Sequence, residues 1–559
     1  MSLSSNVDWR NRFGWNWISS VRHQGSSQNC WAFAATALIE AMVRIEHCVW
    51  ARRSEGDISR GTGKQSWDSG NIGEAGIFAE RYGVSDPDCF AWSEAASLYT
   101  AKPHGGNLTA LPLSPTPDRE GRTVRIPSFI TITDVTKKKE WIDSVGPMAV
   151  MCTPPNDFAV SGTGIYTPTT NASGGAHALL VVGYDDNGQF WIVKNSWGIT
   201  WGDKGFRRIA YAANMLEQQV FWGVRNTNPD PWTKRRLHNG VLIESGNGAN
   251  HNNFELFVKK GLNIERWWRD HGAAGFPWNK VGNVRSTDPW RDSFHDDALD
   301  CPAVIQSTFN RNYELVYRSN FGKLRHVYFD QASQQWYDAT LFGPSDPVGI
   351  PGFVQSTRGA PGDFEVVVLK QNGSLEHWTK HNSSPWTDHK PGEWYSRGTF
   401  GNGISNSGPA LVQSHLGTNS EIESGKGELH YVGTASDGRM HHFRSIGNNF
   451  SIIDTFGTGI TSAPCMIEGQ FGASNELSAG NFELCVGVGG AIEHWWLNSQ
   501  NTNSVWIRSA TFGTQVRRVV SLLEGSFGFN LELIVERTDD RYQHYWRNNQ
   551  GWHAGVIIV

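Results

Sequence analysis

A polar loop that leads into a helix is encoded by residues 23–46, HQGSSQNCWAFAATALIEAMVRIE. The loop contains Gly25, and from Cys30 onward apolar residues recur at helical spacing. We therefore predict a helix over residues 30–46 with Cys30 in its first turn. Free N–H groups and the positive end of the helix dipole stabilise a thiolate there, so Cys30 is a candidate nucleophile. The alternative is a small, buried, apolar residue, a common role of cysteine.

A hairpin further along the chain carries a second pair of candidate residues. Apolar runs at residues 176–184 and 190–194 flank Asp-Asp-Asn-Gly at 185–188, a strong turn signal. If the strands fold about this turn, His177 lies beside Asn195. A carboxamide next to an imidazole fixes the tautomer and the direction of the ring, which a cysteine nucleophile and its base require. We therefore predict a His177–Asn195 contact, although either residue alone is more often structural.

The first ~225 residues resemble the papain-like cysteine proteases. The matching segments are Val7-Asp8-Trp9-Arg10, Gln24-Gly25, Cys30-Trp31-Ala32-Phe33, His177-Ala178, Val182-Gly183-Tyr184, WIVKNSWG at 191–198 and WGDKGF at 201–206. These motifs are long, ordered and correctly spaced. The resemblance implies an α+β fold with a helical lobe and a β lobe.

The resemblance also implies a role for each matched residue. Cys30 would be the nucleophile, and His177 its base and later its acid. Asn195 would orient His177, and Trp197 would shield their hydrogen bond from water. The side chain of Gln24 and the backbone N–H of Cys30 would form the oxyanion hole.

The sequence departs from the family in one disulfide and in the segment next to it. Ser27 stands where the family usually has a cysteine, and the partner segment at residues 67–71, WDSGN, has none. One bridge is therefore lost, and Cys48 and Cys89 could form another or remain free. The altered segment normally lines the substrate cleft, so the family's peptide preference cannot be transferred.

The composition of the chain changes at residues 226–239, NTNPDPWTKRRLHN, which contain two prolines and a basic cluster. We predict a papain-like domain at residues 1–228, a linker at 229–237 and a second domain at 238–559. A short sequence motif with a recurrent glutamate appears six times in the second domain, at Glu255, Glu314, Glu365, Glu428, Glu483 and Glu532. A second motif follows each of these about ten residues later, and it is centred on Arg266, His326, His377, His442, His494 and His544. The repeats are about 50–60 residues long, and strands ending in Phe-Gly follow several of them.

Six such units, each with four short strands, predict an all-β six-bladed propeller. Its C-terminal strand should be tied into the ring, because a loose end would leave an unpaired edge. We interpret the recurrent glutamate and histidine as a buried pair in each blade rather than a metal site. Trp267, Trp378 and Trp495 recur at one strand position and are interpreted as packing between blades.

Carbohydrate binding is the predicted role of the second domain. The chain has 26 tryptophans, and this domain resembles the tryptophan-rich, lectin-type propellers of fungi and bacteria. Aromatic rings stack on sugar rings, and several weak sites together gain strength by avidity. No specific lectin motif is present, so the sugar-binding residues stay undefined. Further candidates are the aromatic residues Trp268, Tyr328, Trp496 and Trp546.

Composition excludes several other classes of function. The formal net charge is −5, which disfavours a protein that neutralises nucleic-acid phosphates. No run of 18 apolar residues predicts a membrane span. No cofactor is expected, because the sequence shows no metal cluster, phosphate loop or nucleotide fingerprint. Residues 1–16 lack the basic start and apolar core of a signal peptide, which favours a cytoplasmic or non-classically released protein over a secreted one.

The predicted function is a cysteine endopeptidase whose substrate is a protein or peptide, targeted by a glycan-binding propeller. An alternative from another class is a lectin or scaffold whose papain-like domain is inactive or transfers acyl groups. In a third interpretation, the propeller is a platform that binds proteins.

Overall fold

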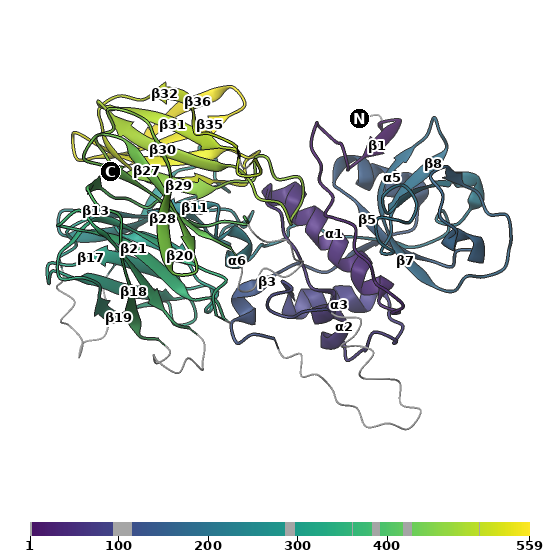
Figure 1. Ribbon diagram of the computed structural model, residues 1–559. Coiled ribbons are helices and arrows are strands. Elements are labelled where there is room, and N and C mark those ends of the chain that lie inside the picture. The colour runs from purple at the N-terminus through teal and green to yellow at the C-terminus, as the bar shows by residue number, and fades with distance from the viewer. Residues whose placement is uncertain are drawn as a thin grey trace. The chain divides into compact units, whose positions relative to one another are not determined.

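The computed structural model describes residues 3–92, 115–284, 297–359, 361–382, 392–416, 427–501 and 503–558. The chain divides into two compact units (Figure 1). The first comprises Met1–Pro229 with Ser474–Glu476, and the second comprises Asp230–Ala473 with Leu477–Val559. Among the described residues, no helix is long and apolar enough to span a membrane.

The first unit combines helices with one large sheet. Its helices are α1 (Cys30–His47), α2 (Glu55–Gly61), α3 (Ile72–Tyr82) and α5 (Val135–Ser144). The helix predicted at residues 30–46 is α1, drawn in purple in Figure 1, and nearly all of its residues are buried. Helix α3 begins with a capping box, in which the side chain of Asn71 accepts from the Glu74 N–H and that of Glu74 accepts from the Asn71 N–H.

The sheet of the first unit is centred on the predicted hairpin. Its strands are β1 (Asn6–Asp8), β4 (Ile130–Ile132), β5 (Met148–Cys152), β6 (Ile165–Tyr166), β7 (His177–Asp185), β8 (Phe190–Lys194), β9 (Phe206–Ala210) and β10 (Phe221–Gly223). Seven of them run in the order β4-β10-β5-β7-β8-β9-β6, and β1 also pairs with β7. A separate short pair joins β2 (Val84–Ser85) to β3 (Thr123–Val124). The nine-residue strand β7 therefore lies in the middle of this sheet.

The second unit begins with the short helix α6 (Pro231–Lys234) and forms six small sheets. Blade 1 holds β12 (Leu242–Glu244), β13 (Phe254–Lys260), β14 (Asn263–Arg269) and β15 (Trp278–Asn283). Blade 2 holds β16 (Ala303–Gln306), β17 (Tyr313–Arg318), β18 (Leu324–Asp330) and β19 (Gln335–Phe342). Blade 3 holds β20 (Pro347–Gln355), β21 (Phe364–Lys370), β22 (Leu375–Lys380) and β23 (Trp394–Phe400).

The other three blades repeat this plan. Blade 4 holds β24 (Ile404–Asn406), β25 (Leu411–Gln413), β26 (Leu429–Ala435), β27 (Met440–Ile446) and β28 (Asn449–Phe456). Blade 5 holds β29 (Pro464–Glu468), β30 (Phe482–Val488), β31 (Ala491–Leu497) and β32 (Ile507–Phe512). Blade 6 holds β11 (His238–Gly240), β33 (Val516–Glu524), β34 (Leu531–Arg537), β35 (Tyr542–Asn548) and β36 (Gly551–Ile557). The predicted six-bladed, all-β architecture is confirmed (Figure 1).

The ring is closed by the first strand of the unit together with the last blade. Strand β11 pairs with β33, with Asn239 opposite Leu522. The C-terminal strand β36 is paired with β35, as predicted, so it is not a loose end. Pairing the beginning of the unit with its end ties the two ends of the ring together through backbone hydrogen bonds.

Aromatic stacking joins neighbouring blades. Phe342 of blade 2 stacks on Trp394 of blade 3, with ring centroids 4.0 Å apart and planes at 6°. The same contact recurs in the pairs Phe400–Phe450, Phe456–Trp506 and Phe512–Trp552. Trp378 and Trp495 pack edge-on against Phe342 and Phe456 of the preceding blade. The Phe-Gly endings therefore supply the inter-blade contacts, and the packing role predicted for Trp378 and Trp495 is confirmed.

Buried carboxylate–imidazole pairs recur in the blades, as predicted. Histidine Nε2 lies 2.6–2.8 Å from a glutamate oxygen in the pairs Glu314–His326, Glu365–His377, Glu483–His494 and Glu532–His544. In blade 1, Arg266 takes the place of the histidine and donates to Glu255 at 3.0 Å. Each of these buried carboxylates thus accepts a hydrogen bond from an imidazole or a guanidinium group, so the pairs hold the strands of a blade together.

Blade 4 departs from the predicted pattern. In the strand register, His430 rather than Glu428 takes the place that Glu365 has in blade 3. Val367, two residues after Glu365, lies opposite His377. Val432, two residues after His430, lies opposite His442. His430 Nδ1 lies 2.9 Å from His442 Nε2, and both residues are buried. The assignment of Glu428 to the recurrent glutamate position was therefore wrong, because sequence spacing near a loop does not define the strand register.

Candidate active site

Cys30 is the first residue of helix α1 and is 8% exposed. Burial raises the pKa of its thiol, whereas hydrogen bonds from the backbone N–H groups of Ala178 and Trp31 act in the opposite direction. Since Ala178 follows His177, the contact with its N–H brings the sulfur of Cys30 beside the first residue of strand β7.

His177 and Asn195 are in direct contact, as the hairpin predicts. His177 Nε2 lies 2.7 Å from Asn195 Oδ1, and both side chains are buried. Because a carboxamide oxygen only accepts hydrogen bonds, the imidazole donates from Nε2, which leaves Nδ1 for other chemistry. Burial lowers the pKa of His177 to about 4, and the bond to Asn195 acts to raise it. Trp197 stacks on the imidazole, with ring centroids 4.5 Å apart and planes at 26°.

Gln24 is held next to these residues by Ser196. The backbone N–H of Gln24 donates to the Ser196 carbonyl at 2.8 Å, and Ser196 Oγ donates to Gln24 Oε1 at 2.6 Å. One N–H of the Gln24 amide donates to the Ser27 carbonyl at 2.8 Å, which leaves the other for a ligand. The backbone N–H of Ser196 donates to Asn195 Oδ1 at 2.8 Å. Sequence reasoning missed this role of Ser196, although the residue lies within a matched segment.

The altered segment at residues 67–71 lies beside the loop that carries Cys30. A Cβ atom on Gly70 would lie 2.3 Å from the ring of Trp31, so only glycine fits against this ring. Ser69 Oγ donates to Gln28 Oε1 at 2.6 Å. Hydrogen bonding and close packing therefore hold this segment where the sequence lacks the family's disulfide.

All seven cysteines are buried and free. Cys48 and Cys89, for which the sequence allowed either a disulfide or two free thiols, are therefore both free in the structure. Among the described residues, no group of three or more His, Cys, Asp or Glu side chains is arranged to hold a metal ion.

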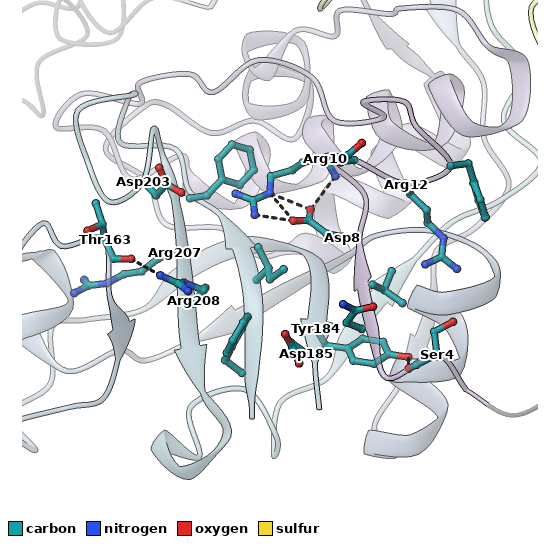
Figure 2. A pocket seen from close by; sticks show the side chains of 17 residues that line it. Ser4, Asp8, Arg10, Arg12, Thr163, Tyr184, Asp185, Asp203, Arg207 and Arg208 are labelled. Carbon is teal, nitrogen blue, oxygen red and sulfur yellow. Dashed lines mark hydrogen bonds and ion pairs between the residues drawn. The ribbon is translucent and has the colours of Figure 1, made fainter. Parts of the chain in front are cut away.

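A pocket of about 670 Å³ lies elsewhere in the first unit (Figure 2). It is formed by the N-terminal segment and strands β7 to β9, and its wall contains neither cysteine nor histidine. Figure 2 shows Arg10 turned toward Asp8, with the charged groups 2.7 Å apart. Arg208 donates to the Thr163 carbonyl at 2.9 Å. This pocket therefore holds no cysteine–histidine pair.

The four aromatic candidates of the second unit are all half-buried. They are Trp268, Tyr328, Trp496 and Trp546. Tyr328 stacks on Tyr337, with ring centroids 5.3 Å apart, and Trp546 stacks on His553 at 4.2 Å. These two rings each have one face occupied within their own blade.

Trp268 and Trp496 have equivalent places in blades 1 and 5. Trp268 lies opposite Glu255 in the strand pairing, and Trp496 lies opposite Glu483. Neither indole stacks on another aromatic ring of the described residues. Of the four candidates, these two have the rings most available to a ligand.

Comparison with known proteins agrees with this geometry. Residues 3–224 match the family described as papain family cysteine protease. Cathepsin L1 of Drosophila melanogaster is 30% identical over 217 residues, which are 37% of this chain and 54% of that protein. Cathepsin L2 of Homo sapiens is 29% identical over 228 residues, 38% of this chain and 63% of that protein. The chain thus spans 54% and 63% of the length of these two curated relatives.

Solved structures also match this part of the chain. Xylellain, a cysteine protease from Xylella fastidiosa, is 22% identical, with 40% of this chain and 87% of that chain covered and a TM-score of 0.34. Digestive procathepsin L 3 of the Tenebrio molitor larval midgut is 23% identical, with 40% and 71% covered and a TM-score of 0.33. On the family match, the N-terminal part of this chain is a papain-family cysteine protease domain.

Proposed function

We propose that the first unit is a cysteine endopeptidase that hydrolyses peptide bonds through Cys30, His177 and Asn195. The observation that carries the proposal is the 2.7 Å hydrogen bond between His177 and Asn195, at a buried site that also contains Cys30 at a helix N-terminus. This arrangement supplies a nucleophile, a base and a group that orients the base.

In the first half of the reaction, the Cys30 thiol transfers its proton to His177, and the sulfur attacks the carbonyl carbon of the substrate. Burial disfavours each isolated charge, so the thiolate and the imidazolium stabilise one another as a pair. The free N–H of the Gln24 amide and the backbone N–H of Cys30 stabilise the oxyanion. His177 then protonates the leaving nitrogen, the C–N bond breaks, and an acyl-enzyme remains.

In the second half, His177 takes a proton from a water molecule, and the resulting hydroxide attacks the acyl carbon. The C–S bond breaks, the peptide acid leaves, and the proton returns to Cys30. Trp197 covers one face of the imidazole and keeps bulk water from the His177–Asn195 bond.

The first test measures whether Cys30 is reactive. The full chain is incubated with a thiol-directed peptide epoxide, and its intact mass is measured with Cys30→Ala as the control. We expect one adduct on the native protein and none on the variant. No adduct on a folded, reduced protein would support the alternative, a lectin or scaffold with an inactive domain. An adduct together with transpeptidation in place of hydrolysis would indicate acyl transfer.

We further propose that the propeller binds glycans and directs the peptidase to glycosylated substrates. The support is the pair of half-buried tryptophans, Trp268 and Trp496, which present equivalent indole rings in blades 1 and 5. A sugar ring stacks on such a surface through its apolar face. Two weak sites on one protein would strengthen binding to a multivalent glycan.

A glycan array with the full chain tests this second proposal. We expect binding that free sugar abolishes and that Trp268→Ala together with Trp496→Ala reduces. Tyr328→Ala is the matched control, because its ring already stacks on Tyr337. Binding to proteins alone, insensitive to free sugar, would favour the protein platform.

A further inference from the structure

A small cavity lies behind the His177–Asn195 pair, between helix α1 and strands β7 and β8. Its volume is about 20 Å³, and its polar wall is formed by Arg22, Glu55, Lys194, Asn195 and Ser196. Each of these five residues is less than 10% exposed. About 10–15 Å³ is enough for one water molecule, provided that two to four polar groups hold it.

The amide of Asn195 has one hydrogen-bonding group without a partner. Its oxygen accepts from His177 and from the Ser196 N–H, at 2.7 and 2.8 Å, which fixes the orientation of the amide. Its Nδ2 is buried and has no hydrogen-bond partner among the described residues. An unsatisfied buried donor costs about 1–3 kcal/mol, so a partner at this position would be favourable.

Two further groups on the cavity wall complement this donor. Arg22 Nε is also buried without a partner among the described residues. Glu55 Oε1 accepts from Thr36 Oγ1 at 3.3 Å and from Arg22, whereas no described donor reaches Glu55 Oε2. The wall thus offers two N–H donors and one carboxylate acceptor.

We propose that one buried water molecule links Asn195 to Glu55. The water accepts from Asn195 Nδ2 and from Arg22 Nε, and it donates to Glu55 Oε2. Three hydrogen bonds are typical of a buried water molecule. Glu55 is then a positioning residue, which acts on His177 through the water and the amide of Asn195. This inference rests on the proposed peptidase function and deepens it.

The charges around Glu55 determine which protonation state of His177 the water link favours. Arg22 contacts Glu55, lies 2.5 Å from Glu40, and lies 3.6 Å from Glu476 of the segment Ser474–Glu476 in the same unit. Burial lowers the pKa of Lys194 to about 8, so it is still protonated at pH 7. Three carboxylates therefore surround two cations, and the excess negative charge strengthens Glu55 as the acceptor of the proposed water. The water link transmits this effect and stabilises the thiolate–imidazolium pair.

The test compares Glu55→Gln with Glu40→Gln in the full chain. Both variants remove one carboxylate that pairs with Arg22, but only Glu55 lines the cavity. The readout is the rate of Cys30 alkylation by iodoacetamide as a function of pH, followed by intact mass. We expect the basic limb, where the imidazolium loses its proton, to move down by about one pH unit in Glu55→Gln. A much smaller shift is expected in Glu40→Gln.

Equal shifts in the two variants would overturn the proposal, because a general loss of negative charge would explain both. A crystal structure of the native protein provides a second test that needs no variant to fold. It should show one ordered water molecule within hydrogen-bond distance of Asn195 Nδ2, Arg22 Nε and Glu55 Oε2. A cavity without this water overturns the inference. Failure of the proposed function would instead appear as alkylation of Cys30 without peptide hydrolysis.

Discussion

The two units use buried charge in different ways. In the second unit, pairs such as Glu314–His326 and Glu532–His544 recur blade after blade, and each pair satisfies its own carboxylate. In the first unit, Arg22, Glu40 and Glu55 form one irregular cluster that borders the catalytic candidates. The repeated pairs serve the fold, because each blade needs the same internal support. The irregular cluster lies next to the Asn195 amide, whose Nδ2 has no protein partner among the described residues.

This difference gives a physical criterion for separating structural from functional polar groups. Breaking a buried pair in which the two partners satisfy each other lowers the stability of the protein, but no catalytic step depends on such a pair. A group with an unused donor or acceptor next to a nucleophile contributes mainly to reactivity. Four predictions, ordered by expected effect, test this distinction.

Asn195→Ala should give the largest effect on activity. His177 would lose the acceptor that orients its ring, so kcat/KM for peptide hydrolysis should fall by about 10²–10⁴-fold. The free energy of unfolding should fall by only about 1–3 kcal/mol, because the His177 Nε2–H and the Ser196 N–H lose their common acceptor. Steady-state kinetics with a peptide substrate and calorimetry measure the two quantities. Retained activity in this variant would remove Asn195 from the mechanism.

Glu365→Ala should show the converse behaviour. It leaves His377 buried without its carboxylate, so the free energy of unfolding should fall by about 3–5 kcal/mol. Burial alone raises the pKa of Glu365, but hydrogen bonds from His377 and Thr379 and the charge of Arg358 lower it to about 2. The contribution of Glu365 is therefore present above pH 4.5 and is lost as pH falls toward 2.

Urea unfolding followed by tryptophan fluorescence measures the effect of Glu365→Ala. Peptidase activity of the folded variant should equal that of the native protein. A selective loss of activity at unchanged stability would contradict the structural role assigned to the recurrent pairs.

The histidine pair of blade 4 should make this blade sensitive to acid. Trp506 Nε1 donates to His442 Nδ1 at 3.3 Å, so His442 donates from Nε2 to His430 and both rings are neutral. Burial lowers the pKa of both histidines, that of His442 most strongly. The unfolded chain binds more protons below pH 6.5, so blade stability is full above this pH and falls by about 1.4 kcal/mol per pH unit for each histidine below it.

Hydrogen exchange of strands β26 and β27 at pH 7 and pH 5, corrected for intrinsic rates, measures this effect. Blade 3, with its Glu365–His377 pair, is the internal control. His430→Glu should restore the pairing of the other blades and remove most of the acid sensitivity. Equal pH dependence in blades 3 and 4 would show that the exchange of glutamate for histidine has no consequence.

The smallest expected effect concerns one hydrogen bond in blade 5. Ser509 Oγ lies 2.7 Å from His494 Nδ1, whereas His326 and His377 have no partner at Nδ1 among the described residues. Ser509→Ala should therefore lower the free energy of unfolding by only about 1 kcal/mol. Urea unfolding measures it, with Ser504→Ala on a neighbouring loop as a comparison. A loss as large as that of Glu365→Ala would mean that Nδ1 is essential to the pair.

Much of the fold could be predicted because its signals are local or periodic. The apolar spacing after Cys30 predicts helix α1 to within one residue of its end. The Asp-Asn-Gly turn predicts the hairpin and brings His177 to Asn195. Six repeats predict six blades, because each repeat carries its own strands and turns. Side-chain hydrogen bonds between distant segments, such as Ser196 to Gln24, have no local signal and could not be predicted.

The sequence by itself determined which residues could take part in catalysis, and it placed them at the start of a helix and in a β-hairpin. Only the tertiary structure decided which polar groups are left without partners. The hydrogen-bonding state of Asn195 depends on Arg22 and Glu55, which lie far away in the chain and meet it at one cavity. The pairing of His430 with His442 likewise depends on strand register. Burial removes water as a competing partner, so these groups acquire their roles only when distant segments pack together.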